Sequence, residues 1–79
     1  MSCTIGRADV VTDEYVIEIK HYRHWKSAFG QVLAYCIHFG SRKPWVHFFG
    51  KKPSQSVLDT IRTFGERHGV RLSAEPDEY

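Results

Sequence analysis

Residues 7–20 read RADVVTDEYVIEIK, and this stretch decides how the fold begins. Residues 7–11 and 15–20 are rich in β-branched side chains and flank a polar turn at residues 12–14, which predicts a β-hairpin. A loop of two residues, or of four, pairs Val11 with Val16 and Asp9 with Glu18, whereas a loop of three breaks this register. Because side chains alternate between faces, one face then carries Asp9, Glu18 and Lys20, and the other carries Ala8, Val10, Ile17 and Ile19.

The two opposed carboxylates of this hairpin need a compensating charge. Their Cβ atoms are expected about 4.5–5.5 Å apart, where like charges destabilise a sheet. Asp9, Glu18 and the backbone carbonyl of Ile19 form the oxygen ligand set that Mg²⁺ accepts while it keeps several waters. Lys20 points at the same place, where an amine can hold or deprotonate an attacking water and offset charge on a phosphate. The pattern therefore predicts a metal-dependent phosphodiesterase site, but an ordinary solvated strand face has the same Glu-x-Lys alternation and stays open.

The length and composition indicate one domain, residues 1–79. A chain of this size buries only about 60–65% of the surface that its unfolded form exposes. A hydrophobic content of 42% with 14% aromatic residues predicts a packed globule and excludes a disordered chain. The net charge of +2 is too small to indicate nucleic-acid binding by itself, although the pairs Arg42-Lys43 and Lys51-Lys52 allow a local basic face.

The cysteines and the hydropathy of the chain bear on its location. Cys3 and Cys36 form neither a disulfide framework nor a paired metal-binding motif, which fits a reducing compartment. No apolar run reaches the roughly eighteen residues that span a bilayer, and the first residues do not have the pattern of a signal peptide. We therefore expect an intracellular protein, in the cytoplasm or nucleus or in the host cell of a virus, without contact to a membrane.

Two amphipathic helices are predicted after the hairpin. The first ends at Gly40, and its apolar residues recur with helical spacing at Trp25, Ala28, Phe29, Val32, Cys36 and Phe39. The second begins after a cap at Ser54 or Ser56 and ends before Gly69, with apolar residues at Val57, Leu58, Ile61 and Phe64.

Two further strands complete the predicted fold. Lys43-Pro44 is expected to break the chain before a central strand at residues 45–49, and residues 70–74 are expected to form an edge strand. The predicted order β-β-α-β-α-β corresponds to an α/β domain with a mixed sheet flanked by two helices.

Three segments together resemble a known family. They are Gly6-Arg7-Ala8-Asp9, then Val16-Ile17-Glu18-Ile19-Lys20, then residues 25–35 with Gln31 and Tyr35. In this order they resemble the core of the PD-(D/E)XK, or restriction-endonuclease-like, nucleases. The resemblance implies that Asp9 and Glu18 bind Mg²⁺ or Mn²⁺, that Lys20 assists the nucleophilic water, and that Gln31 supports the site, with Tyr35 a weaker candidate. It also implies hydrolysis of DNA to a 5′ phosphate and a 3′ hydroxyl.

The chain departs from that family at two points. Ala8 stands where the family motif has proline, and only eight residues precede Asp9, which leaves no room for the acidic N-terminal helix of many members. The chain is then a minimal core, a fragment, or a domain whose partner subunit completes the site. One alternative is a non-catalytic module of the same fold that binds nucleic acid or another subunit, and another is an unrelated α/β domain in which the motif is coincidental.

Several other polar and aromatic residues are candidates for contacts to DNA or to a metal ion. Arg23 and Lys26 follow the strand that carries Glu18, so they are the best candidates for contacts to DNA phosphates. A zinc site is disfavoured because His21, His24, Cys36 and His38 match no recurring ligand spacing. Core packing is favoured over base stacking for the aromatic residues Trp25, Phe29, Trp45, Phe48 and Phe49. A homodimer is plausible, since a twofold dimer matches the symmetry of duplex DNA.

Overall fold

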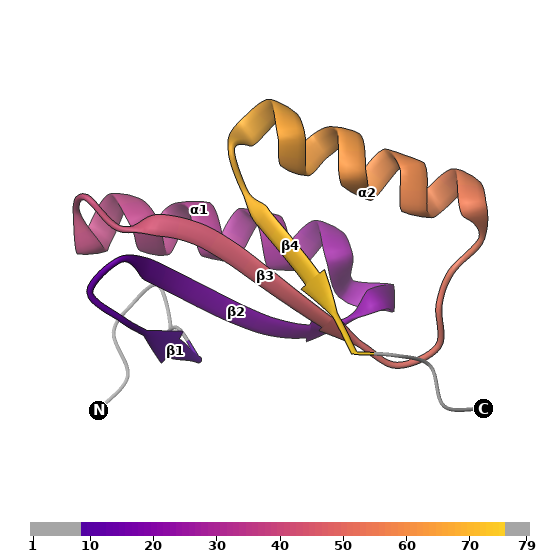
Figure 1. Cartoon of the computed structure of the whole chain (residues 1–79), viewed down its shortest axis with the longest axis horizontal. Coiled ribbons are helices and arrows are strands. Elements are labelled where there is room, and N and C mark those ends of the chain that lie inside the picture. Colours follow the sequence, from indigo (N-terminus) through magenta and orange to yellow (C-terminus); the bar gives the residue numbers. More distant parts are fainter. Residues whose placement is uncertain (1–8, 76–79) are drawn as a thin grey trace.

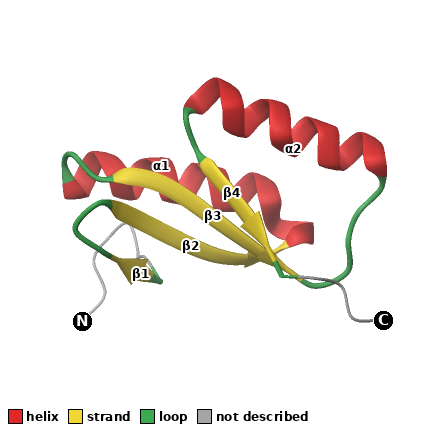
Figure 2. Ribbon diagram, in the orientation of Figure 1, coloured by secondary structure: helices red, strands yellow, loops and turns green. Residues whose placement is uncertain are grey.

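The elements of the computed structural model, which describes residues 9–75, follow the predicted order. Figure 2 shows strands and helices alternating after the initial hairpin. The elements are β1 (Val10–Val11), β2 (Tyr15–His21), the short 3-10 helix η1 (Tyr22–His24), α1 (Trp25–Phe39), β3 (Lys43–Phe49), α2 (Gln55–His68) and β4 (Arg71–Ala74). Residues 7 and 8, which the sequence assigns to the first strand, lie outside the described part. None of the helices in residues 9–75 is long and apolar enough to cross a bilayer.

The strands form one mixed sheet in the order β1-β2-β3-β4 (Figure 1). β1 runs antiparallel to β2, whereas β2, β3 and β4 are parallel to one another. The predicted central position of β3 and edge position of β4 are both confirmed. Each parallel connection passes through a helix, α1 between β2 and β3 and α2 between β3 and β4, as crossover connections require.

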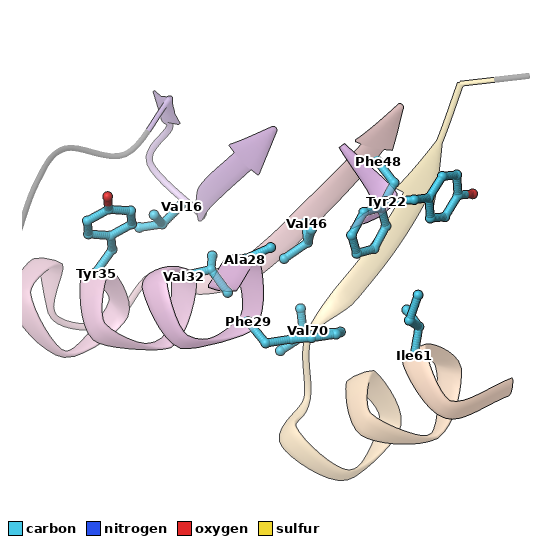
Figure 3. Packing of buried hydrophobic residues seen from close by; sticks show 10 residues of the cluster. All are labelled: Val16, Tyr22, Ala28, Phe29, Val32, Tyr35, Val46, Phe48, Ile61 and Val70. Carbon is cyan, nitrogen blue, oxygen red and sulfur yellow. The ribbon is translucent and has the colours of Figure 1, made fainter. Parts of the chain in front are cut away.

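Both helices pack on the same face of the sheet. The strands contribute Val16, Val46 and Phe48 to this face, and they meet Phe29 of α1 and Ile61 of α2 in the core (Figure 3). The ring of Phe29 lies 4.7 Å from that of Phe64, so the two helices also contact each other through aromatic side chains. The core is completed by Tyr22, Ala28, Val32, Tyr35 and Val70.

Pro44 lies inside β3, so the predicted chain break at Lys43-Pro44 is wrong and the strand begins at Lys43. The Lys43 amide donates to the Glu14 carbonyl at 2.8 Å, and Lys43 therefore faces β2. The neighbouring Pro44 faces the opposite side, where β4 begins only at Arg71, opposite Trp45. Since no described strand lies beside Pro44 on that side, the N–H that proline lacks has no acceptor to lose there.

The ends of α2 confirm the predicted caps. The Ser54 side chain, rather than that of Ser56, accepts a hydrogen bond from the Val57 amide at 3.4 Å. Gly69 ends the helix with a φ of 66°, in the left-handed region that favours glycine. These two residues fix where α2 starts and stops, and hence where β4 returns to the sheet.

No described helix covers the other face of the sheet, which is turned toward the viewer in Figure 1. We call it the open sheet face; strand alternation and register assign to it Val10, Tyr15, Ile17, Ile19, His21, Lys43, Trp45, His47, Phe49, Arg71 and Ser73. Trp45 and Phe49 lie here and not in the core, so the prediction that all five aromatic residues pack inside is wrong for these two.

Candidate functional site

The hairpin has the predicted register. Val11 pairs with Val16 and Val10 with Ile17, so the next position along brings Asp9 beside Glu18. One oxygen of Asp9, Oδ2, accepts a hydrogen bond from the Ile19 backbone amide at 2.8 Å. This bond holds the Asp9 carboxylate across the hairpin and next to the strand segment that carries Glu18 and Lys20.

Glu18 is the only buried charged residue in residues 9–75, with 3% of its surface exposed. It lies on the face of β2 that also presents Val16 to the core, because the two residues are two positions apart. Burial first, and then the nearby Asp9 carboxylate, raise the pKa of Glu18, while Lys20 lowers it. The interpretation of Glu18 as part of a solvated strand face is therefore wrong, since its face of the sheet is covered by α1.

The two oxygens of Glu18 have different surroundings. Oε2 lies 3.4 Å from the Lys20 ammonium, whose side chain is 29% exposed. Oε1 is buried and has no hydrogen-bond partner in the described part of the chain. A buried carboxylate oxygen without a donor is costly, so this atom has unused capacity for a ligand. We call Asp9, Glu18 and Lys20 the hairpin cluster.

The hairpin cluster fits a hard divalent cation. Its donors are Glu18 Oε1 and the second oxygen of Asp9, and Mg²⁺ is commonly bound by one or two carboxylates while it keeps waters. The Ile19 carbonyl remains the predicted third ligand, and it points to the β1 side like its amide, since both groups of a strand residue face the same neighbour. In residues 9–75, no three His, Cys, Asp or Glu side chains are grouped so that they could hold one metal ion together, and the hairpin cluster contributes two carboxylates.

The remaining predicted site residues lie on η1 and α1, the two helices that follow β2. Gln31 is half-buried on α1 and makes no side-chain hydrogen bond in the described part of the chain. Tyr35, one turn further, is buried beside Val16 (Figure 3). Arg23, in η1, and Lys26, in the first turn of α1, are both exposed just beyond the end of β2, and Lys26 Nζ lies 5.6 Å from the centre of the Trp25 ring.

The open sheet face carries a second set of polar and aromatic residues. We did not predict this set from the sequence. The Arg71 guanidinium lies 4.1 Å from the centre of the Trp45 ring, and the Tyr15 ring meets Trp45 edge-on at 5.2 Å. Ser73 Oγ accepts from Trp45 Nε1 at 2.8 Å and lies 2.7 Å from His47 Nδ1. The signal was present in the alternation Trp45-x-His47-x-Phe49, which places these side chains on one face.

Comparison with known proteins gives three relatives, all from Acanthamoeba polyphaga mimivirus and all named as KilA-N domain-containing proteins. They are 43%, 34% and 33% identical to this chain over 67 residues, which is 85% of its length. The matched stretch covers only 18%, 26% and 18% of the relatives, so the chain spans a fifth to a quarter of their length.

The other two comparisons return no match. No protein-family model matches the chain. No solved structure is significantly similar to it. The resemblance to PD-(D/E)XK nucleases therefore depends on the hairpin cluster, on residues 25–35 with Gln31 and Tyr35, and on the order of the elements.

Proposed function

We propose that this domain binds DNA and that its hairpin cluster hydrolyses phosphodiester bonds with the help of Mg²⁺ or Mn²⁺. The observation that carries the proposal is Glu18, a buried carboxylate with one partnerless oxygen, placed beside a second carboxylate and a lysine. Burying a charge in this way costs stability unless a ligand compensates it. Such a cost at one position of a small domain is typical of a functional site.

Asp9 and Glu18 would hold the metal. When bound, it would supply Lewis-acid polarisation of the phosphate and lower the pKa of water. The Asp9–Ile19 hydrogen bond orients one carboxylate, and the core packing around β2 fixes the other. Both carboxylates are thus positioned before any ligand arrives, which reduces the cost of assembling the site.

Lys20 has a separate role in this proposal. Its ammonium already lies against Glu18 Oε2, and its partly exposed side chain can reach a phosphate from the same side. There it would hold the attacking water and offset the charge that builds on the phosphate. The water oxygen forms a bond to phosphorus while the bond to the 3′ oxygen breaks, the 3′ oxygen gains a proton, and the water loses one to solvent.

The second candidate function is DNA binding without catalysis. The relatives are named for a KilA-N domain, and we take this name as support for DNA binding. The name describes proteins of which this chain spans about a fifth to a quarter. The ion pair of Glu18 with Lys20 and the bond of Asp9 with Ile19 also give these side chains structural partners. In this function, Arg23 and Lys26 contact phosphates and no bond is broken.

Cleavage and binding assays separate the two functions. Labelled single-stranded, duplex and four-way-junction DNA are incubated with the chain and Mg²⁺ or Mn²⁺, and the variants Glu18→Gln and Lys20→Ala are tested beside it. Glu66→Gln and Lys52→Ala are the matched controls, since both remove the same charge from an exposed position. Folding of every variant is checked by circular dichroism.

Each result selects one function. Cleavage by the wild type and by both controls, lost in Glu18→Gln and Lys20→Ala, supports the nuclease. Binding of DNA by all five proteins without cleavage supports the non-catalytic module and overturns the nuclease. If none of them binds or cuts any of the substrates, both proposals are wrong.

A further inference from the structure

We propose that the open sheet face is a binding surface for single-stranded DNA, on which bases stack against the Arg71–Trp45 pair. The surface lies on the opposite side of β2 from Glu18, because Ile17 and Ile19 alternate with it along the strand. The inference rests on the DNA-binding part of the proposed function and does not depend on hydrolysis.

Three strands contribute one connected set of side chains to this surface. Tyr15 comes from β2, Trp45 from β3 and Arg71 from β4, and Arg71 lies over both rings, 5.6 Å from Tyr15 and 4.1 Å from Trp45. Arg71 is exposed, so a ligand can approach it from solvent. Bases of single strands stack on aromatic rings and on guanidinium planes alike.

Hydrogen bonds hold this set in place. Trp45 Nε1 donates to Ser73 Oγ at 2.8 Å, and Arg71 donates to the Tyr15 hydroxyl at 3.4 Å. The first bond joins the neighbouring strands β3 and β4, and the second reaches from β4 across β3 to β2, so both side chains are held by contacts between strands. A rigid platform loses little conformational entropy when a ligand stacks on it, which favours binding.

The charge of the open sheet face complements a phosphate backbone. Arg71 and Lys43 are its cations, and both are exposed. Glu75, which follows β4, places a carboxylate oxygen 3.7 Å from His47 Nε2 beside the surface. The aliphatic side chains of Ile17 and Ile19 extend the platform toward β1, where they can contact sugars and base faces.

An uncovered sheet face favours an unpaired strand over a duplex. Reading of a duplex requires a helix, a two-stranded ribbon or an arm that enters a groove, and the bases of a duplex have no free faces to stack on a sheet. A single strand can splay its bases over the rings while its phosphates reach Arg71 and Lys43.

Fluorescence anisotropy of labelled oligo(dT) tests the inference. The measurement is made in EDTA so that cleavage cannot contribute, with a duplex of equal length for comparison. We expect Arg71→Ala to weaken oligo(dT) binding about tenfold, since stacking is worth about 1–3 kcal/mol per base. Arg71→Lys keeps the charge but not the planar guanidinium, and it should recover only part of the affinity.

The matched control is Arg67→Ala. It removes an exposed cation from α2 and should change the affinity less than threefold, about the effect of one surface charge.

Tryptophan fluorescence gives an independent measurement. The chain has two tryptophans, so Trp25→Phe leaves Trp45 as the sole reporter, and oligo(dT) should quench it. Glu66→Gln removes an exposed carboxylate from α2 and should bind oligo(dT) like the wild type. Because binding is measured in EDTA, its outcome is separate from the failure of hydrolysis. Equal losses in Arg71→Ala and Arg67→Ala, an unquenched Trp45, or preference for duplex would overturn the inference. Light scattering provides a further test. If the protein without DNA is a dimer and Arg71→Ala is a monomer, the surface binds a second copy of the chain and the inference is wrong.

Discussion

The carboxylate of Asp9 and the backbone amide of Ile19 are joined by a hydrogen bond of 2.8 Å across the hairpin. β1 is only two residues long, Val10–Val11, so this side-chain bond continues the contact of the hairpin beyond its backbone pairs. It gives Asp9 two separable properties: an oxygen that accepts the amide, and a negative charge beside Glu18.

Asparagine and alanine at position 9 separate these properties. Asp9→Asn keeps a side-chain oxygen for the Ile19 amide, so we expect the free energy of unfolding to stay within about 0.5 kcal/mol of the wild type. Asp9→Ala removes the acceptor and should cost about 1 kcal/mol. Urea denaturation measures both. Equal stability of the two variants would mean that the bond contributes nothing to folding.

Glu18→Gln should stabilise the protein at neutral pH in the absence of metal. Burial raises the pKa of Glu18 above its ordinary value of 4.5, so ionisation penalises the folded state. Below pH 4.5, Glu18 is protonated in both the folded and the unfolded protein, so its burial costs no stability through ionisation. As the pH rises from 4.5 through the higher pKa of the folded state, the free energy of unfolding falls. A gain of about 1 kcal/mol corresponds to a Tm increase of about 4–8 °C for a domain of this size.

Thermal denaturation of both proteins at several pH values checks this prediction. The Tm difference between Glu18→Gln and the wild type should be large near neutral pH and shrink toward acidic pH. The exposed Glu66→Gln is the control and should show no such trend. A wild type that is the more stable protein at neutral pH would contradict the expected sign.

Divalent metal should stabilise the wild type and not Glu18→Gln. A ligand that binds only the folded state at a hundred times its Kd adds about 2.7 kcal/mol. Glu18 has a raised pKa, so it holds its proton to a higher pH, and the metal must displace this proton to bind. The Mn²⁺-induced rise in Tm should therefore increase with pH. Titration of Mn²⁺ followed by thermal shift measures the effect. A rise of equal size in Glu18→Gln would place the metal elsewhere.

The hairpin and its register followed from the sequence because two independent signals agree there. The β-branched runs define the strands, and the polar turn between them allows few pairings. The sequence alone therefore places Asp9, Glu18 and Lys20 together. The helix caps Ser54 and Gly69 were predictable for the same reason, since each residue type satisfies a specific need of a helix end.

Which face of the sheet is covered could not be predicted in the same way. Both faces of β2 carry apolar residues, Val16 on one and Ile17 and Ile19 on the other, so hydrophobic alternation does not select the core side. The sequence suggested a polar face around Glu18, whereas α1 packs there and leaves Ile19 and Trp45 on the open side. That choice depends on the path of the helix after β2, which is a tertiary property.

The core of α1 provides a last test of the fold itself. Phe29 is 1% exposed and its ring contacts Trp25, Phe48 and Phe64, whereas Ile37, on the same helix, is 86% exposed. Phe29→Ala should cost about 3–5 kcal/mol, which approaches the whole stability of so small a domain. Ile37→Ala removes an apolar side chain of the same helix and should cost less than about 0.5 kcal/mol.

Circular dichroism during thermal denaturation compares the two variants. We expect Ile37→Ala to unfold cooperatively close to the Tm of the wild type. Phe29→Ala should lose its cooperative transition or shift it downward by tens of degrees, at roughly 4–8 °C for each kcal/mol. Similar transitions in both variants would mean that α1 presents a different face to the sheet. In that case the conclusion that α1 buries Glu18 would also be wrong.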